Sequence, residues 1–290
     1  METIQDQQPK LTLQRRRQTV QFFVEPLNEE VGIDMMLIPA GTFLMGSPED
    51  ELDRNNSESP QHEVNVSTFF MGKYPVTQAQ WRVVAAMPQV NRSLEPDPSQ
   101  FKGDKRPVEQ ASWFDAVEFC DRLSTHTRRE YCLPTEAEWE YACRSGTTTS
   151  FHFGETITTD LANYDGTDDP DGKWSGSYGR GSKGEYRKET TSVDYFEIAN
   201  AFGLCDMHGN VWEWCQDHWH DNYQGTRSAT APTDGNAWLD KNENNSRIIR
   251  GGSWNNLPRN CRSASRYYDS PDYTYSYIGF RAVCLAPRTL

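Results

Sequence analysis

The chain has 290 residues, a formal net charge of -13 and a sequence pI near 4.9. This acidity argues against a broad nucleic-acid interface, because binding to phosphates requires a basic surface. The beginning of the chain has no apolar stretch like that of a secretory signal, and no apolar run is long enough to span a membrane. The 7 cysteines are scattered and odd in number, which favours reduced thiols. We therefore expect a cytoplasmic protein that neither binds nucleic acid nor inserts into membranes.

The first part of the chain predicts a polar segment followed by a folded domain. Residues 1–30 are polar and rich in glutamine, and we interpret them as an N-terminal segment that precedes one domain over residues 31–290. Residues 35–47 predict a strand, a turn and a second strand, and residues 62–70 alternate as a further strand would. The 9 Trp, 13 Tyr and 13 Phe supply large units of apolar burial, so a core can form although aliphatic residues are few.

Two capping signals and one stretch of apolar residues at helical spacing predict three helices. Thr77 and Thr135 are each followed three residues later by Gln or Glu, which is the spacing of a capping box. Ser112 precedes apolar residues at helical spacing. Residues 147–198, rich in Gly, Asp, Ser and Thr, predict a long loop, and such loops inside compact domains usually have a function or a bound ligand.

The most unusual stretch runs from Arg250 to Cys284. Two adjacent glycines open it and predict a tight backbone passage beside a packed ring, whereas the apolar alternation of residues 278–284 predicts a buried strand. Between them, Asn255–Tyr277 is rich in Tyr, Ser, Asn, Asp and Arg. That composition is typical of a binding surface, because Tyr gives large rigid contact area while Ser and Asn adapt their hydrogen bonds. The alternative is that these tyrosines are ordinary half-buried aromatics of a surface hairpin.

A coding pattern favours the binding surface. Asn255–Tyr277 contains no Lys, Glu, Gln, Met or Trp, although all of them occur repeatedly elsewhere in the chain. Codons with two free bases followed by cytosine cannot encode any of these residue types. Asn, Tyr, Ser, Asp, Thr and Leu can all be reached from the codon AAC by replacing adenines. The segment therefore has the residue content that adenine-directed mutagenesis would leave.

Several motifs resemble those of a known family. The RGGSW motif, the arginine-rich turn after it and the closing IGFRAVC are similar to the C-terminal signature of the formylglycine-generating (sulfatase-modifying factor) family, and LPTEAEWEYA and NAFGLCDMHGNVWEW match further family segments. The resemblance implies an α+β domain with the C-type lectin fold, in its formylglycine-generating enzyme-like variant, with little regular secondary structure. The segment of about 250–284 more closely resembles the variable region of proteins diversified by retroelements, especially cyanobacterial ones.

This resemblance implies a non-catalytic protein that binds a ligand, which we expect to be a protein, through a diversified surface over about residues 255–277. Arg262 and Arg266 are expected to belong to the framework, where charged hydrogen bonds would hold the loop. The positions expected to determine specificity are Asn255, Asn256, Leu257, Ser265, Tyr267, Tyr268, Asp269, Ser270, Tyr273, Thr274, Tyr275, Ser276 and Tyr277.

The family resemblance also implies structural calcium, an ion that takes oxygen ligands from carboxylates and backbone carbonyls. On spacing alone, a carboxylate that caps backbone N–H groups is an equally good interpretation of the first motif. The first implied set is Asp206, Gly209, Val211 and Glu213, and a second, weaker set is Asn163, Tyr164, Glu185 and Arg187.

The main alternative is an oxidoreductase of the formylglycine-generating type. Enzymes of that type use copper and two cysteines shortly after the GGS motif, and thiolate is the ligand that copper(I) selects. Here Asn255 and Asn256 follow the motif and Cys261 stands alone, so the sequence disfavours this chemistry. A third possibility is a structural or regulatory accessory module without a ligand. Two histidines at 218 and 220 are expected to be solvated loop residues, and Cys205 and Cys215 to be buried thiols.

Overall fold

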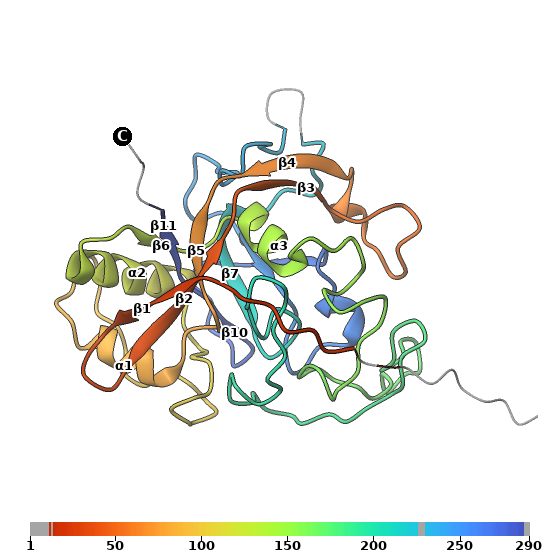
Figure 1. The fold of residues 1–290 in the computed structure, drawn as a ribbon, viewed down its shortest axis with the longest axis horizontal. Coiled ribbons are helices and arrows are strands. Elements are labelled where there is room, and N and C mark those ends of the chain that lie inside the picture. Colours follow the sequence, from red (N-terminus) through yellow and green to blue (C-terminus); the bar gives the residue numbers. More distant parts are fainter. Residues whose placement is uncertain (1–11, 13, 226–229, 287–290) are drawn as a thin grey trace, which may run out of the picture.

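The computed structural model describes residues 12, 14–225 and 230–286, and it has a mixed α+β architecture in which loops make up much of the chain (Figure 1). The helices are α1 (Gln78–Ala85), α2 (Trp113–Thr127) and α3 (Glu136–Arg144), with short 3-10 turns η1 (Asn56–Glu58) and η2 (Pro258–Cys261). The strands are β1 (Phe22–Pro26), β2 (Gly32–Ile38), β3 (Gly41–Met45), β4 (His62–Val66), β5 (Phe69–Gly72), β6 (Tyr131–Cys132), β7 (Trp212–His218), β8 (Arg247–Arg250), β9 (Arg266–Asp269), β10 (Ile278–Gly279) and β11 (Val283–Leu285).

The first sheet joins both ends of the domain. Its strand order is β1-β2-β5-β11-β6, and neighbouring strands are antiparallel. The last strand of the chain, β11, lies between β5 and β6, with Val283 opposite Met71 on one side and Cys132 on the other. Figure 1 shows β11 beside β6, close to the C-terminal end of the described chain. The C-terminal residues are therefore needed to complete this sheet.

The domain begins earlier than the sequence analysis placed it. Strand β1 lies within residues 1–30, where a polar segment was expected, and it pairs with β2 from Phe22 opposite Met36 to Pro26 opposite Gly32. Because β1 is an edge strand, Phe22 and Val24 keep 56% and 52% of their surface exposed, and the apolar pattern that marks a buried strand is weak. The polar segment therefore ends before Phe22.

The second sheet carries the C-terminal segment. Its order is β10-β7-β8-β9, with β10 parallel to β7 and the other pairs antiparallel. Strand β9 pairs with β8 from Arg247 opposite Asp269 to Arg250 opposite Arg266, and it lies at the edge of this sheet. A separate hairpin, β3 with β4, covers the side of the molecule near α3 (Figure 1).

All three predicted helix starts are confirmed. Thr77, Ser112 and Thr135 each accept a hydrogen bond from the backbone N–H three residues later, and each belongs to a complete capping box. Helix α3 ends where Ser145 turns into the left-handed region, with φ of 44°, followed by Gly146 with φ of 91°. These boundaries follow from local chemistry, which is why the sequence predicted them.

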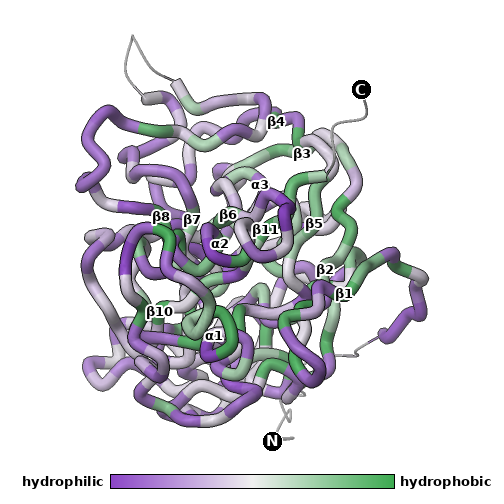
Figure 2. The backbone as a smooth tube through the Cα atoms, turned by 90° about the vertical axis from the view of Figure 1, so that its left-hand side faces the viewer, coloured by the Kyte–Doolittle hydropathy of each residue, from purple (hydrophilic) through white to green (hydrophobic). Residues whose placement is uncertain are grey.

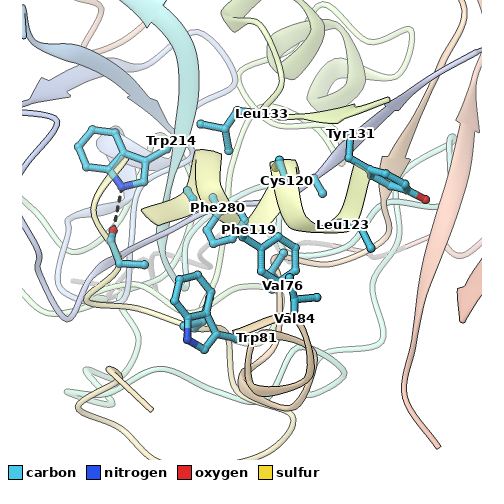
Figure 3. Packing of buried hydrophobic residues seen from close by; sticks show 14 of the residues in the cluster. Val76, Trp81, Val84, Phe119, Cys120, Leu123, Tyr131, Leu133, Trp214 and Phe280 are labelled. Carbon is cyan, nitrogen blue, oxygen red and sulfur yellow. Dashed lines mark hydrogen bonds between the residues drawn. The ribbon is translucent and has the colours of Figure 1, made fainter. Parts of the chain in front are cut away.

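Aromatic side chains fill the main core (Figure 3). The rings of Trp81 and Phe119 are stacked with centres 5.8 Å apart, and Phe280 packs edge-on against Phe119 at 5.2 Å. Helices α1 and α2 thus meet the IGFRAVC segment in one cluster. Trp214 is also fully buried, and its Nε1 donates to the carbonyl of Ala111 at 3.1 Å.

Residues 147–198 contain no helix or strand longer than an isolated bridge, as the composition predicted. In Figure 2 the hydrophobic stretches follow strands such as β2, β5 and β8, whereas the connecting loops are mostly hydrophilic. Over residues 14–225 and 230–286, none of the helices has the length and apolar character that crossing a bilayer requires.

Candidate ligand-binding surface

Four buried arginines attach the segment 250–284 to the rest of the domain. Their side chains are at most 2% exposed, and each forms an ion pair with a buried glutamate. A planar guanidinium and a carboxylate can share two parallel hydrogen bonds, which fixes both partners in orientation as well as distance. The pairs are Arg250 with Glu140, Arg262 with Glu58 and Glu51, Arg266 with Glu136, and Arg281 with Glu213.

Two of these arginines were predicted as framework, and their geometry confirms it. Arg262 reaches the two carboxylate oxygens of Glu58 at 2.6 and 2.9 Å, and Glu51 at 2.6 Å. Arg266 reaches the two oxygens of Glu136 at 2.6 and 2.9 Å. The first contact fixes η2 to the loop before β4, and the second fixes β9 to the start of α3.

The predicted tight passage at Gly251 and Gly252 is also present. Both residues have φ in the left-handed region, 97° and 74°, which favours glycine. A Cβ placed on Gly251 would lie 3.0 Å from the Trp139 ring, and one on Gly252 would lie 2.6 Å from Sγ of Cys261. The packed ring beside this passage is therefore that of Trp139, on α3.

Three of the predicted tyrosines are displayed to solvent. Tyr267 and Tyr268 on β9 are 54% and 41% exposed, and Tyr273 in the following loop is 54% exposed. Tyr275 and Tyr277 are half-buried and pack against the main core, with their rings stacked at 4.8 Å. The interpretation as ordinary half-buried aromatics thus holds for this last pair only. Asp272 and Thr274, beside Tyr273, are exposed as well.

The other predicted positions form a second patch that joins the first. Asn255, Asn256 and Leu257 are half-buried, and the carbonyl of Asn256 accepts a hydrogen bond from the backbone of Asp165 at 2.8 Å. Trp254 connects the two patches, because its Nε1 donates to the carbonyl of Ser276 at 2.9 Å. Residues on both sides of η2 therefore meet at one face.

One predicted position does not belong to this face. Ser265 is only 4% exposed, and its carbonyl accepts a hydrogen bond from Arg250, so it is part of the buried frame. Its residue type matched the coding pattern, but its place one residue before the buried Arg266 turns it inward. Asp269, Ser270 and Ser276 are half-buried.

Two tryptophans outside the segment support its exposed tyrosines and were missed by the sequence analysis: Trp212 is buried and Trp219 is half-buried. Trp212 lies under Tyr267 with ring centres 6.0 Å apart, and Trp219 packs against Tyr268 at 4.5 Å. Both lie on or just after β7, two strands away from β9, so only the strand order reveals the contact. The motif that contains them gave no signal for it.

The first predicted calcium set does not have free oxygens at its centre. Both oxygens of Glu213 accept hydrogen bonds from Arg281, at 2.6 and 2.7 Å, and one also accepts from Nε1 of Trp139 at 2.7 Å. The carbonyl of Gly209 accepts from the N–H of Val211 at 3.0 Å. A guanidinium beside this carboxylate opposes a second cation, so these residues do not fit calcium in this arrangement.

Asp206, the remaining side chain of that set, has a buried oxygen, Oδ2, without a hydrogen-bond partner among the described residues. Burial raises the pKa of this carboxyl to about 8. The charges of Arg281 and Glu213 also act on this carboxyl, so Asp206 lies close to that pair. It does not complete a set of calcium ligands.

The second predicted set is better placed for a cation. Its two halves lie together, since Gly166 donates to the carbonyl of Glu185 at 3.1 Å. Asn163 is 1% exposed, and its Oδ1 has no donor within the described part of the chain. Glu185, however, is 60% exposed at its side chain and pairs with Arg187. Tyr164 is buried beside them. Calcium at these residues stays a prediction.

The cysteines do not form the pair that formylglycine chemistry uses. All 7 are free, and Cys261 is fully buried behind Gly252, where burial raises the pKa of its thiol far above the ordinary value. Cys205 and Cys215 are buried thiols, as predicted. In the part of the chain that the structure describes, no three His, Cys, Asp or Glu side chains are grouped as metal ligands.

The prediction of two solvated loop histidines is wrong for His218, whereas His220 lies in the loop after β7 and is half-buried. His218 is 0% exposed because it ends strand β7, and its Nδ1 accepts from the backbone N–H of Asp240 at 2.9 Å. His220 stacks on Trp238 with ring centres 3.6 Å apart. Both serve packing in this region, and burial lowers the pKa of His218.

The main cavities lie away from residues 255–277. One of about 1140 Å³ is bounded by the 48–52 loop and residues 148–182, and two smaller ones measure about 270 and 200 Å³. None of the three is lined by a residue of the segment 255–277. The exposed tyrosines Tyr267, Tyr268 and Tyr273 therefore do not line any of these three cavities.

The two sheets, the capped helices and the long loops define a C-type lectin fold of the formylglycine-generating type. The chain belongs to the family of the sulfatase-modifying factor enzyme 1-like domain, whose model matches residues 23–286.

Proteins that are similar to this chain in sequence or structure carry several different names. The mouse formylglycine-generating enzyme is 29% identical over 297 residues, which cover 85% of this chain and 74% of the relative. The structure of PvdO from Pseudomonas aeruginosa superposes with a TM-score of 0.72 at 28% identity, covering 91% of this chain and 98% of PvdO. Treponema denticola variable protein 1 superposes with a TM-score of 0.68 at 24% identity, covering 91% and 99%.

Proposed function

We propose that this chain is a non-catalytic binding protein that takes a protein ligand on the face formed by residues 255–277. The observation that carries the proposal is that one segment contains both buried, ion-paired arginines and exposed tyrosines. Its arginines 262 and 266 are buried in ion pairs, while Tyr267, Tyr268 and Tyr273, which follow them in the chain, are exposed. A rigid frame with exposed aromatic anchors is what recognition surfaces use, because Tyr contributes contact area at low entropic cost.

The segment is further proposed to be diversified by a retroelement. Its missing residue types support adenine-directed mutagenesis, and the solvent exposure of Tyr267, Tyr268 and Tyr273 means that substitutions there disturb little of the core. The same fold carries a protein named variable protein 1 in Treponema denticola, so the scaffold is compatible with this use. The free cysteines support a reducing compartment, the cytoplasm.

The test is to sequence this gene, with its flanks, from many isolates of its source. Substitutions are expected to concentrate at the exposed positions of 255–277, in codons that end in cytosine, with a near-copy carrying AAC codons beside a reverse transcriptase gene. Positions 250, 262, 266 and 281 are expected to stay arginine, because each is an ion-pair partner in the core. Substitutions spread evenly over the chain would overturn the proposal.

The enzyme alternative rests on the identity to the mouse formylglycine-generating enzyme. Its test is incubation of the purified chain with copper and a cysteine-containing sulfatase peptide, followed by mass spectrometry for formylglycine. We expect no conversion, because Cys261 is buried and holds a protonated thiol. Conversion that disappears in Cys261→Ser would establish the alternative.

A further inference from the structure

One carboxylate on the proposed binding face has no counter-charge. Asp269, at the end of β9, accepts a hydrogen bond from its neighbour Ser270 at 2.8 Å, and no Lys, Arg or His of the described chain forms an ion pair with it. Burial raises the pKa of Asp269. A half-buried carboxylate without a partner is costly to ionise, and a bound cation would lower that cost.

The one arginine opposite this aspartate is engaged elsewhere. Arg247 faces Asp269 across the pairing of β8 with β9. Its guanidinium, however, lies 3.8 Å from the centre of the Trp113 ring and donates to the carbonyl of Gln216 at 2.7 Å. Arg247 is therefore not available as the counter-ion.

A cluster of tyrosine rings lies in the same segment as this carboxylate. Tyr275 and Tyr277 stack at 4.8 Å, and Tyr273 meets Tyr275 edge-on at 6.0 Å. Burial and then the charge of Asp269 raise the pKa of Tyr275, and the charges of Tyr275, Asp269 and Tyr267 join burial in raising the pKa of Tyr277 to about 12. Trp212 brings the tyrosine cluster and the strand of Asp269 together, because its backbone N–H donates to the carbonyl of Tyr277 at 2.8 Å and its ring lies 6.0 Å from the ring of Tyr267. Tyr267 is two residues before Asp269 on β9, so both side chains lie on the same face of that strand.

The charge balance of the face is negative. Residues 255–277 contain three arginines and two aspartates as their charged residues. The charges of Arg262 and Arg266 are neutralised by buried ion pairs, and the guanidinium of Arg259 lies 3.6 Å from the centre of the Trp174 ring. The two carboxylates of Asp269 and Asp272 outnumber the one positive charge that Arg259 keeps over that ring, on a chain of net charge -13. Such a surface attracts a cationic partner and repels an anionic one.

We propose that Asp269 and the rings of Tyr267, Tyr275 and Tyr277 form a site for a guanidinium group, so that the protein ligand inserts an arginine side chain there. This inference rests on the proposed function of the face. A guanidinium suits the site better than an ammonium, because it is planar, stacks on aromatic rings, is weakly hydrated and pairs with a carboxylate through two hydrogen bonds.

The experiment selects phage-displayed random dodecapeptides on the immobilised wild-type chain. Synthetic versions of the selected peptides are then titrated against wild type and against the triple variant Tyr267→Ser/Tyr268→Ser/Tyr273→Ser. We expect these peptides to carry an arginine and to lose binding to the triple variant. Replacing that arginine with citrulline, which keeps the shape and removes the charge, is expected to weaken binding about tenfold, the effect of one charge-assisted hydrogen-bonded pair.

The matched pair of chain variants is Asp269→Asn and Asp272→Asn. Asp269→Asn keeps the oxygen that accepts from Ser270, so its melting temperature should match wild type, yet it is expected to weaken the arginine peptides about tenfold. Asp272→Asn removes an exposed charge nearby and is expected to change binding less than about twofold.

The possible outcomes distinguish the guanidinium site from the proposed binding function on which it rests. Peptides that need the three tyrosines but lack arginine, carry lysine instead, or bind Asp269→Asn as well as wild type would overturn the guanidinium site and leave the binding face intact. Equal weakening by Asp269→Asn and Asp272→Asn would also overturn the site, since it would reflect general acidity. A failure to select any peptide that needs the tyrosines would overturn the proposed function and this inference with it.

Discussion

Because Arg262 belongs to the buried framework of the segment and not to its exposed surface, we predict that replacing it strongly destabilises the fold. Arg262→Met removes three hydrogen bonds to carboxylate oxygens and leaves Glu51 and Glu58, whose side chains are 5% and 1% exposed, without their guanidinium partner. Breaking a buried ion pair on one side costs about 3–5 kcal/mol. For a chain of this length that corresponds to a fall in melting temperature of roughly 5–10 °C. The assay is a urea and thermal melt of the purified variant beside wild type.

The loss of stability in Arg262→Met should also depend on pH in a definite direction. Burial already raises the pKa of Glu51, and the guanidinium of Arg262 opposes that rise. Without the guanidinium, the folded-state pKa of this carboxyl lies further above its unfolded value. Such a group stabilises the fold below the unfolded pKa, and the stabilisation is lost as pH rises through the folded pKa. The deficit of Arg262→Met should therefore be smaller at pH 5 than at pH 8.

Two further variants complete the test. Arg262→Met/Glu58→Gln should recover part of the loss, because one stranded charge is gone. Arg259→Met, on the same 3-10 turn, should cost only about 1 kcal/mol, since its guanidinium lies over Trp174 without a carboxylate partner. The reasoning is refuted if Arg262→Met unfolds within about 1 kcal/mol of wild type at pH 8, or if its deficit is the same at both pH values.

Three other outcomes are expected. Tyr273→Ser should change the free energy of unfolding by less than ~0.5 kcal/mol because its ring is 54% exposed, whereas Phe280→Ala should cost ~3–5 kcal/mol; equal urea midpoints would mean that Tyr273 is core. Calcium should raise the melting temperature of wild type but not of Asn163→Ala, because Oδ1 of Asn163 is a buried acceptor without a donor in the described chain; an undiminished shift in the variant would contradict this. Burial raises the pKa of Glu138 to about 7, so from pH 5 to 8 wild type should lose up to about 3 kcal/mol relative to Glu138→Gln, which can still cap Thr135; chemical denaturation that finds parallel pH profiles would refute it.

Features that depend on neighbouring residues in the chain could be predicted from the sequence. The capping boxes predicted at Thr77 and Thr135 are contained within four residues each, and both are present; the helix predicted from Ser112 also begins there. The positive φ angles at Gly251 and Gly252 follow from residue type in the same way. The fold itself came from motifs, not from periodicity, because much of the chain is loop.

Features that depend on which strands meet could not be predicted. Ser265 and Tyr267 both match the coding pattern, yet one is buried and the other is 54% exposed, because β9 lies at a sheet edge and the turn before it lies inside. His218 was expected in a solvated loop, but β7 is an inner strand of its sheet. The partner of Glu213 was also missed, since Arg281 lies 68 residues further along the chain.

The position of β11 has a consequence for how this protein folds. This strand enters between β5 and β6, and it follows the segment 255–277 in the chain. During synthesis from the N-terminus, the sheet stays divided, with the facing edges of β5 and β6 unpaired, until the whole of that segment has left the ribosome. A substitution in the segment that keeps β11 from its place would leave those edges open to aggregation and proteolysis. Closure of the sheet would then act as a folding checkpoint on the residues that precede it.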